Sequence, residues 1–343
     1  MNLSQVLKSP IPFLIFIFLS GGVSAQITDF KGINFEKADS VAALHPFHSI
    51  DNLKLLSDNL TGPLPTQIEK FRAIYRWVCE NIENDYGLYK RNKVKREKLK
   101  DRPEELSKWN KEFNLIVLKH LIKRQQTVCT GYAYLVKELA YHAGINCEIV
   151  NGYGRTIEAN IGGDGIPNHS WNAVELNKKW YLCDPTWSSG SINISETSFI
   201  PNFNEGYFLA DPSLFSLNHY PLETNWLLVE DKPLLSSFLN GPLVYKGALN
   251  KQIYPRSPEA FEVVVQKGEP FQIAFGSKQP VDGSKVKMQL DTGNETFFTK
   301  ALPQERQEGY YSLDYTFISR GSYVIHVLLE DEYILTYHVK VIK

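Results

Sequence analysis

The chain has 343 residues, of which 43% are hydrophobic and 22% are charged, a composition typical of folded globular proteins. At roughly 150 residues per domain, this length predicts about two domains. The 37 basic and 38 acidic side chains leave a formal net charge of -1, so no overall field attracts nucleic acid or acidic lipid. Four cysteines are too few for a disulfide scaffold in a chain that can bury a large core. Extended disorder, collagen and coiled coil are excluded.

Residues 1–25 have the pattern of a removable secretory signal. Lys8 supplies a positive start, Ile11 to Leu19 an apolar stretch, and Val23-Ser24-Ala25 a small-residue cleavage site. The alternative is an uncleaved anchor, but this apolar stretch is shorter than the ~20 residues that a bilayer span needs. We therefore expect an exported protein, periplasmic or secreted, with no transmembrane segment in the mature chain.

The first half of the chain predicts helices. Apolar spacing indicates short helices between Asp39 and Leu60 and an amphipathic helix from Thr66 to Ile82, with a capping box at its start. The stretch Lys90 to Arg102 is strongly basic and has almost no apolar anchor, so we expect a solvated insertion. A basic patch for membrane or nucleic acid is the alternative, but aromatic interleaving is absent. A second helix follows, from about Pro103 to Lys123.

The second half predicts a helix, a strand, a loop, a hairpin and then a β-rich segment. A helix over Tyr132 to Ala143 ends before Gly144, and Ile145 to Val150 alternates as a strand. Gly152 to Asn168 is glycine-rich, and we expect a mobile loop. Leu227 to Glu259 should hold a linker and one or two strands. The following β-like runs, which predict a small sandwich, are Phe271 to Phe275, Lys285 to Leu290, Tyr323 to Leu329 and Ile334 to Val341.

Three residues form a candidate site: Cys129 in TVCTGYAYL, His169 in NHSWNAVEL and Asp184 in KWYLCDPTW. A thiol needs a base to become a thiolate, and the base needs a carboxylate to orient it, so the ordered set is typical of nucleophilic catalysis. Cys129 lies where we expect a helix to begin, and a helix N-terminus favours the thiolate anion.

The predicted hairpin brings His169 and Asp184 together. If Asn177-Lys178 is a two-residue turn, the strands His169 to Leu176 and Lys179 to Asp184 pair antiparallel. His169 is then diagonal to Asp184 on one face of the sheet, at about 7–8 Å between backbones, which an imidazole can bridge. Cys183 must point to the other face and cannot replace the aspartate.

Each member of the candidate site also has an ordinary structural reading. A cysteine at a helix start is commonly buried packing, and Asp184 before Pro185 is typical of a turn. A zinc site of Cys129, His169 and Cys183 is a further alternative, but no CxxC or HxxxH spacing supports it. The ordered set favours catalysis, and we expect no cofactor and no metal.

Four stretches together resemble the transglutaminase-like cysteine enzymes, in particular the branch that includes the kyphoscoliosis peptidase, over roughly Ser57 to Leu228. These stretches are IEKFRAIYRWVCENI (Ile68 to Ile82), VCTGYAYLVKELAYHAGI (Val128 to Ile145), HSWNAVELNKKWYLCDPTW (His169 to Trp187) and YFLADPSLFSLNHYPLETNWLL (Tyr207 to Leu228). The resemblance implies a papain-like core, with the cysteine on a central helix and the histidine and aspartate on an adjacent antiparallel sheet.

By position, the resemblance implies that Cys129 is the nucleophile, His169 the general base and then acid, and Asp184 the residue that orients the imidazole. The implied reaction is acyl transfer through a thioester. The backbone N–H of Cys129 would donate to the oxyanion, and the candidates for a second donor are Gln125, Gln126 and Trp77.

Two further features bear on that resemblance. The family usually has glycine two residues before the cysteine, where this chain has Thr127, which we expect to narrow the approach to the thiol. The family fold makes the strands of Cys147 and Cys183 neighbours, so a disulfide is an alternative to the two buried thiols that we favour. Cys79 is expected in the core. Of three aromatic residues expected to pack on the sheet, Trp171, Trp180 and Trp187, the last could instead line the cleft.

We therefore predict an α+β protein: a transglutaminase-like, papain-like domain over residues 26–230, then an Ig-like β-sandwich over 231–343. The leading hypothesis is an exported cysteine peptidase or amidase whose substrate is a protein or peptide, with a possible protein partner for the sandwich. The alternatives are a cross-linking transglutaminase and a non-catalytic scaffold. The family's animal cross-linkers use calcium, and no acidic loop here resembles a calcium site, which favours hydrolysis.

Overall fold

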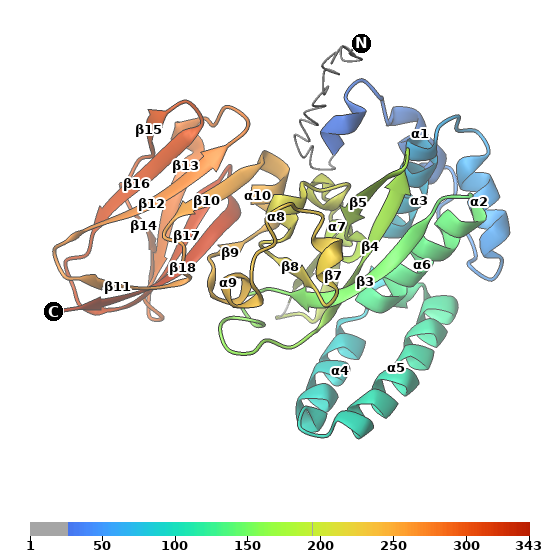
Figure 1. Ribbon diagram of the computed structural model, residues 1–343, viewed down its shortest axis with the longest axis horizontal. Helices are drawn as coiled ribbons and strands as arrows, with labels where there is room; N and C mark the ends of the chain where they lie inside the picture. Colours follow the sequence, from blue (N-terminus) through green and yellow to red (C-terminus); the bar gives the residue numbers. More distant parts are fainter. Residues whose placement is uncertain (1–26, 194) are drawn as a thin grey trace, which may run out of the picture.

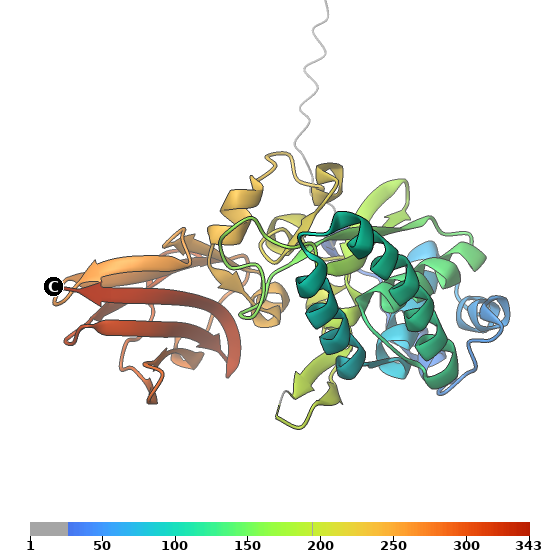
Figure 2. The ribbon, with the colours of Figure 1, turned by 90° about the horizontal axis from the view of Figure 1, so that it is seen from below.

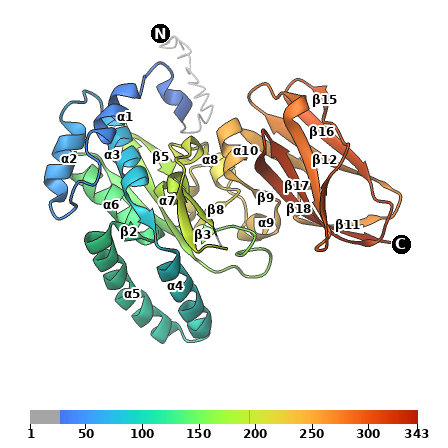
Figure 3. The same ribbon diagram turned by 180° about the vertical axis from the view of Figure 1, so that it is seen from behind.

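The computed structural model describes residues 27–193 and 195–343, and the predicted signal over residues 1–25 lies outside them. A helical part and a four-stranded sheet make one body, and a β-sandwich makes the other (Figure 1). The helices α9 and α10 and the short strand β9 lie between the two (Figures 1 and 3). No helix in the described ranges is long and apolar enough to cross a membrane.

The elements follow one another in a helical first half and a β-rich second half. The α-helices are α1 (Glu36–Ala43), α2 (Leu53–Thr61), α3 (Gln67–Asn81), α4 (Tyr86–Leu99), α5 (Pro103–Arg124), α6 (Cys129–His142), α7 (Pro185–Ser189), α8 (Pro212–Phe215), α9 (Leu235–Asn240) and α10 (Lys246–Lys251). The strands up to the junction are β1 (Glu83–Asn84), β2 (Gln126–Thr127), β3 (Cys147–Gly154), β4 (His169–Leu176), β5 (Lys179–Cys183), β6 (Gly190–Asn193), β7 (Ser198–Pro201), β8 (His219–Pro221) and β9 (Leu243–Val244). The strands after it are β10 (Ile253–Ser257), β11 (Glu262–Gln266), β12 (Pro270–Ser277), β13 (Val286–Asp291), β14 (Thr296–Phe298), β15 (Gln304–Gln307), β16 (Tyr310–Thr316), β17 (Gly321–Leu329) and β18 (Glu332–Ile342). Four 3-10 turns cover Ile27–Phe30, Glu205–Tyr207, Thr224–Leu227 and Gly283–Lys285.

The helix α6 is the centre of the first body. It packs against α2 and α3 on one side and against β3 and β4 on the other. The predicted capping box of α3 is confirmed, because Thr66 accepts from the Glu69 backbone while the Glu69 side chain accepts from the Thr66 backbone. Apolar side chains from α3 and α6 fill the core between these layers, which fixes where α6 begins relative to the sheet.

The sheet confirms the predicted hairpin register. Its order is β5-β4-β3-β8, and β4 pairs with β5 so that Leu176 faces Lys179 and Asn172 faces Cys183. Both turn residues, Asn177 and Lys178, have positive φ, as a two-residue hairpin turn of type I′ requires.

The disulfide alternative fails on strand order. The strand β4 lies between the strands of Cys147 and Cys183, so these strands are not neighbours, and both cysteines are free and buried. Two strand spacings of about 4.8 Å exceed the reach of a disulfide.

The basic insertion is helical, contrary to the expectation of an unpacked segment. It forms α4, which lies antiparallel beside α5 at one end of the molecule (Figures 1 and 2). Leu88 of α4 packs with Phe113 and Val117 of α5, and Arg96 donates to the Asn110 side chain at 2.9 Å. Lys, Arg and Glu are good helix formers, so a few buried anchors suffice to hold this charged helix.

The glycine-rich stretch Gly152 to Asn168 is tied down at both ends, which the expectation of a mobile loop did not include. Arg96 of α4 donates to the Pro167 carbonyl at 2.6 Å, and Gly162 N–H donates to the Leu239 carbonyl of α9 at 2.8 Å. Arg155 holds the loop to the segment after α9. The loop therefore connects α4 with the segment around α9 through these hydrogen bonds.

The second body is the predicted Ig-like sandwich. One sheet has the order β10-β12-β16-β15, and the other has β11-β18-β17-β13-β14, with β9 also paired to β18. Alternating apolar residues of both sheets form its core, and the same buried cluster extends to Trp171 and Leu182 of the first body. This continuous packing positions the sandwich against the sheet that carries the candidate site.

Candidate functional site

Cys129 is the first residue of α6 and the one cysteine of the four that is not fully buried. Burial raises the pKa of the Cys129 thiol, but the adjacent His169 imidazole and the Ser170 backbone N–H lower it by more, so the net shift is downward. Burial raises the pKa of the other three thiols, Cys79, Cys147 and Cys183. Cys129 thus has the environment of a reactive thiol.

His169 bridges Cys129 and Asp184. Its Nε2 lies 2.8 Å from Asp184 Oδ2, which leaves the other side of the imidazole for the thiol. Burial lowers the pKa of His169, but the Asp184 carboxylate and Cys129 outweigh burial and raise it to about 10. The indole of Trp187 stacks on the imidazole at 5.0 Å between centroids. The ring is thereby held between a carboxylate, a thiol and an aromatic plane.

Asp184 is both the predicted turn residue and the partner of the histidine. Its Oδ1 accepts from the backbone N–H groups of Thr186 and Trp187, which caps α7, while its Oδ2 bonds the imidazole. The carboxylate is fully buried, and burial raises its pKa, but His169 and His219 lower it by more, so the net shift is downward. Asp184 can cap α7 and contact His169 at the same time, because the two interactions involve different carboxylate oxygens.

A second histidine at Asp184 was missed in the sequence. His219 Nε2 lies 3.0 Å from the same Oδ2, and its Nδ1 lies 2.6 Å from Asn218 Oδ1. The imidazole is 1% exposed among the rings of Trp187 and Phe215, and burial lowers its pKa to about 4. His219 stands in the triplet NHY, within a stretch that resembles the family. No pattern in the sequence indicated that it contacts Asp184, which lies 35 positions earlier.

Thr127 does not narrow the approach to the thiol, because its side chain is fully buried. A Cβ built on Gly131 would lie 1.8 Å from Thr127 Oγ1, so the threonine occupies space that the helix leaves empty at Gly131. Gly131 in the first turn of α6 therefore leaves room for the Thr127 side chain, which stands where the family usually has glycine.

Of the three candidates for a second oxyanion donor, Trp77 has its only N–H occupied, whereas Gln125 and Gln126 each use one of their two amide N–H groups. Trp77 Nε1 donates to the His45 carbonyl and Gln125 Nε2 to the His48 carbonyl, each at 2.7 Å, while Gln126 Nε2 donates to Glu83 at 2.8 Å. The backbone N–H of Cys129 itself has no main-chain acceptor within residues 27–193. It remains available to a substrate oxygen at the positive end of α6.

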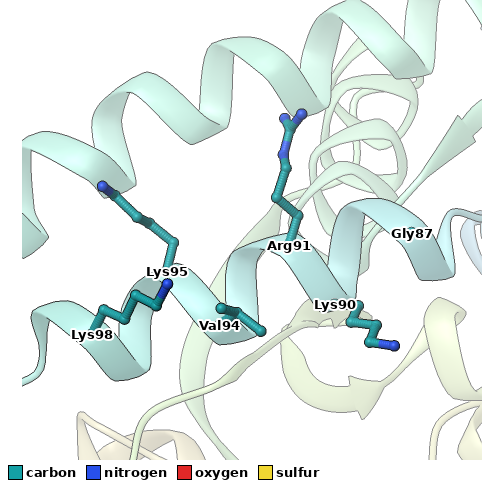
Figure 4. Close-up of a pocket in the computed structure, with 6 residues that line it drawn as sticks. All are labelled: Gly87, Lys90, Arg91, Val94, Lys95 and Lys98. Carbon is teal, nitrogen blue, oxygen red and sulfur yellow. The ribbon is translucent and has the colours of Figure 1, made fainter.

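The helix α4 flanks the candidate site. Its half-buried Arg96 has a pKa that burial lowers and the nearby Cys129 raises, with a net downward shift. Farther along α4, the side chains of Lys90, Arg91, Lys95 and Lys98 line a hollow of about 390 Å³ together with Gly87 and Val94 (Figure 4). Figure 4 shows Arg91 and Lys95 extending toward the neighbouring helix. The basic side chains of the predicted insertion therefore lie on an exposed face of α4.

The described residues bring together one set of possible metal ligands, and it differs from the zinc alternative. Ligand atoms of His169, Asp184 and His219 lie within 4.8 Å of one another. Both imidazoles already bond one carboxylate oxygen, and Cys183 is buried on the other face.

Comparison with known proteins agrees with this geometry. Residues 54–185 match the transglutaminase-like superfamily. The chain is 30% identical to the mouse (Mus musculus) protein named kyphoscoliosis peptidase over 68% of this chain and 33% of that protein. It is 26% identical to hillarin of Drosophila melanogaster over 62% of this chain and 25% of that protein. The chain thus spans about a third of the length of the kyphoscoliosis peptidase.

Among solved structures, the Lin-41 filamin domain aligns with 29% of this chain and 97% of its own, at 15% identity and a TM-score of 0.22. The sequence matches lie over the segment that holds Cys129, His169 and Asp184. The chain therefore carries a domain of the transglutaminase-like superfamily and resembles the kyphoscoliosis peptidase branch in particular.

Proposed function

We propose that this protein is an exported cysteine hydrolase, a peptidase or amidase that acts on protein or peptide amides through a thioester. The observation that carries the proposal is the hydrogen bond between His169 and Asp184 beside Cys129, whose thiol lies at the N-terminus of α6 and has its pKa lowered by His169. The name of the mouse relative, a peptidase, supports hydrolysis.

In this mechanism His169 takes the thiol proton, and the Cys129 thiolate attacks the carbonyl carbon of the amide. The new C–S bond places negative charge on the carbonyl oxygen, which the backbone N–H of Cys129 faces. His169 then gives its proton to the leaving nitrogen as the C–N bond breaks. Water attacks the thioester, His169 accepts the water proton, and the C–S bond breaks to return the thiol. Asp184 holds the imidazole in the orientation that both steps need.

A transglutaminase would follow the same path until an amine replaces water at the thioester. A non-catalytic scaffold would need a blocked or inert thiol. The buried Thr127 and the partial exposure of Cys129 speak against a blocked thiol.

The test is to incubate the protein with a peptide library made by digesting a whole proteome, with and without dansylcadaverine, and to identify products by mass spectrometry. We expect new termini or deamidated glutamine from the native protein and none from Cys129→Ala, while the matched control Cys147→Ala keeps its activity. Dansylated peptides as the main product would assign the transglutaminase instead. Equal product patterns from the native protein and Cys129→Ala would contradict both enzymes.

A further inference from the structure

A cavity of about 440 Å³ lies where the two bodies meet. The first body contributes Arg155, Thr156 and Trp187 to its lining, the junction contributes Tyr245 and Lys246, and the sandwich contributes Tyr333 among others. This volume falls in the range of about 300–1,000 Å³ that is typical of ligand pockets.

The cavity adjoins the candidate active site through Trp187. Trp187 lines the cavity and stacks on His169 at 5.0 Å between ring centroids. On the other side, a Cβ on Gly154 would lie 2.9 Å from His169 Cβ, so the residue just before Arg155 lies directly against the histidine. Trp187 and the segment Gly154-Arg155 therefore lie between the cavity and His169, so a ligand in the cavity is one side chain away from the histidine.

Arg155 gives the cavity its chemistry. The residue is 3% exposed, and all its side-chain hydrogen bonds within the described ranges go to uncharged backbone carbonyls. Nε donates to the Asn160 carbonyl at 3.0 Å, Nη1 donates to the Pro242 carbonyl at 2.8 Å, and Nη2 donates to the Gly241 carbonyl. Three of the five N–H groups of the guanidinium are used, so two remain for another acceptor.

The charge of Arg155 has no counter-ion among the residues that the structure describes. Its nearest charge-stabilising neighbours there are backbone carbonyls and the Phe261 ring, whose centroid lies 5.9 Å from the guanidinium, and burial lowers its pKa to about 10. Of the two carboxylates that line the cavity, Asp331 pairs with Lys287 at 2.6 Å, and neither Asp331 nor Glu332 contacts Arg155. A buried cation is normally paired with an anion, because burial without one is costly.

We propose that this cavity is a substrate subsite in which Arg155 binds the carboxylate of a peptide, so that the β-sandwich helps to select an acidic substrate. The proposal rests on the proposed function. It gives the sandwich a role, since Asp331, Glu332 and Tyr333 at the β17–β18 turn line the same cavity as Arg155. The carboxylate belongs either to an Asp or Glu side chain or to the C-terminus of the peptide.

The experiment uses acetylated tetra-alanine chloromethyl ketones in which Asp or Asn replaces alanine at each position in turn. Reaction forms a C–S bond to Cys129 as the C–Cl bond breaks and chloride leaves. We expect the native protein to react at least about tenfold faster with the Asp probe than with its Asn counterpart at one position. Arg155→Gln should bring this ratio close to one, while Lys246→Gln, a matched change of a second cation in the lining, should reduce it far less.

Arg155 also holds the loop through its hydrogen bonds, so its replacement could disturb the fold. A second pair of variants therefore tests the cavity while leaving the Arg155 hydrogen bonds in place. Thr156→Trp fills the cavity and should slow the Asp probe, whereas Ile157→Trp, at an exposed neighbour outside the lining, should not. Protection of Cys129 from iodoacetamide by tri-alanine free acid, but not by its amide, would assign the C-terminal carboxylate as the source.

Iodoacetamide separates this proposal from the proposed function. Suppose that iodoacetamide reacts with an activated Cys129, but the Asp and Asn probes react equally at every position and the free acid gives no protection. The subsite proposal is then overturned, while the proposed function stands. If the iodoacetamide reaction is that of an ordinary thiol, the proposed function fails. Isothermal titration of Cys129→Ala with tri-alanine acid and with acetyl-Ala-Asp-Ala amide then decides whether the cavity binds carboxylates, and no heat from either overturns the subsite.

Discussion

His219 Nε2 lies 3.0 Å from Asp184 Oδ2, the carboxylate oxygen that His169 also contacts. The carboxylate therefore has imidazole partners on two sides and backbone donors at its other oxygen. His219 does not face the thiol, so we assign it as a positioning residue that keeps Asp184 ionised and aimed at His169.

Replacing His219 should weaken the Cys129 thiolate without removing it. In His219→Phe the ring volume is kept, but the hydrogen bond to Asp184 is lost, so we expect Cys129 alkylation by iodoacetamide at pH 6 to slow by about tenfold. His219→Gln keeps a nitrogen donor and should recover most of the rate. The measurement is the alkylation rate from pH 5 to 9. Because the pKa of His219 is near 4, the ratio of native to variant rates should not show a step near pH 6.5. An equal decrease of the alkylation rate in His219→Phe and His219→Gln would contradict a positioning role.

The space shared by Thr127 and Gly131 predicts a coupled pair of substitutions. Gly131→Ala normally favours a helix, but here its Cβ would meet Thr127 Oγ1 at 1.8 Å, so we expect a loss of about 2 kcal/mol in the free energy of unfolding. Thr127→Gly in the same chain should recover much of that loss, because it removes the colliding side chain. Urea unfolding midpoints measure both. If the double variant loses as much unfolding free energy as the two single variants together, the two residues do not share this space.

The hairpin and the pairing of His169 with Asp184 could be predicted from the sequence because they are local, whereas the place of Cys129 beside them was implied by the family resemblance. A two-residue turn at Asn177-Lys178 fixes the register of β4 and β5, and that register places His169 on the same face as Asp184. His219 could not be predicted in the same way, since β8 reaches the sheet through β3, and no short-range pattern encodes that pairing.

The helix α4 was mispredicted for a different reason. Its low apolar content suggested an unpacked segment, but helix propensity and a few anchors such as Leu88, together with α5, outweigh composition. The contact between Thr127 and the space at Gly131 could not be predicted either, because it depends on the residue at which α6 begins.

The placement of Arg96 predicts a modest electrostatic effect on the thiol. Its half-buried cation lies near Cys129, so Arg96→Gln should raise the thiol pKa and slow alkylation at pH 6 by about threefold. Arg91→Gln is the matched control, because Arg91 is an exposed residue of the same helix in the basic hollow. Identical effects of the two substitutions would mean that the overall charge of α4, rather than Arg96 itself, acts on the thiol.

The free cysteines predict a simple thiol count. In the folded protein without reductant, Ellman's reagent should modify Cys129 quickly and the buried Cys79, Cys147 and Cys183 slowly. After unfolding in urea, still without reductant, all four cysteines should react. A loss of two reactive thiols in the unfolded protein would reveal a disulfide and contradict the separation of Cys147 and Cys183 by β4.

The central claim is that His169 activates Cys129, and the pH dependence of Cys129 alkylation in the native protein and in His169→Ala tests it most directly. The pKa of the thiol is lowered mainly by its contacts with His169, so the native rate should stay high below the ~8.5 of an ordinary cysteine. In His169→Ala the rate at pH 6 should collapse and then rise as the pH approaches ~8.5. Two superimposable profiles, both rising near that pH, would contradict the account.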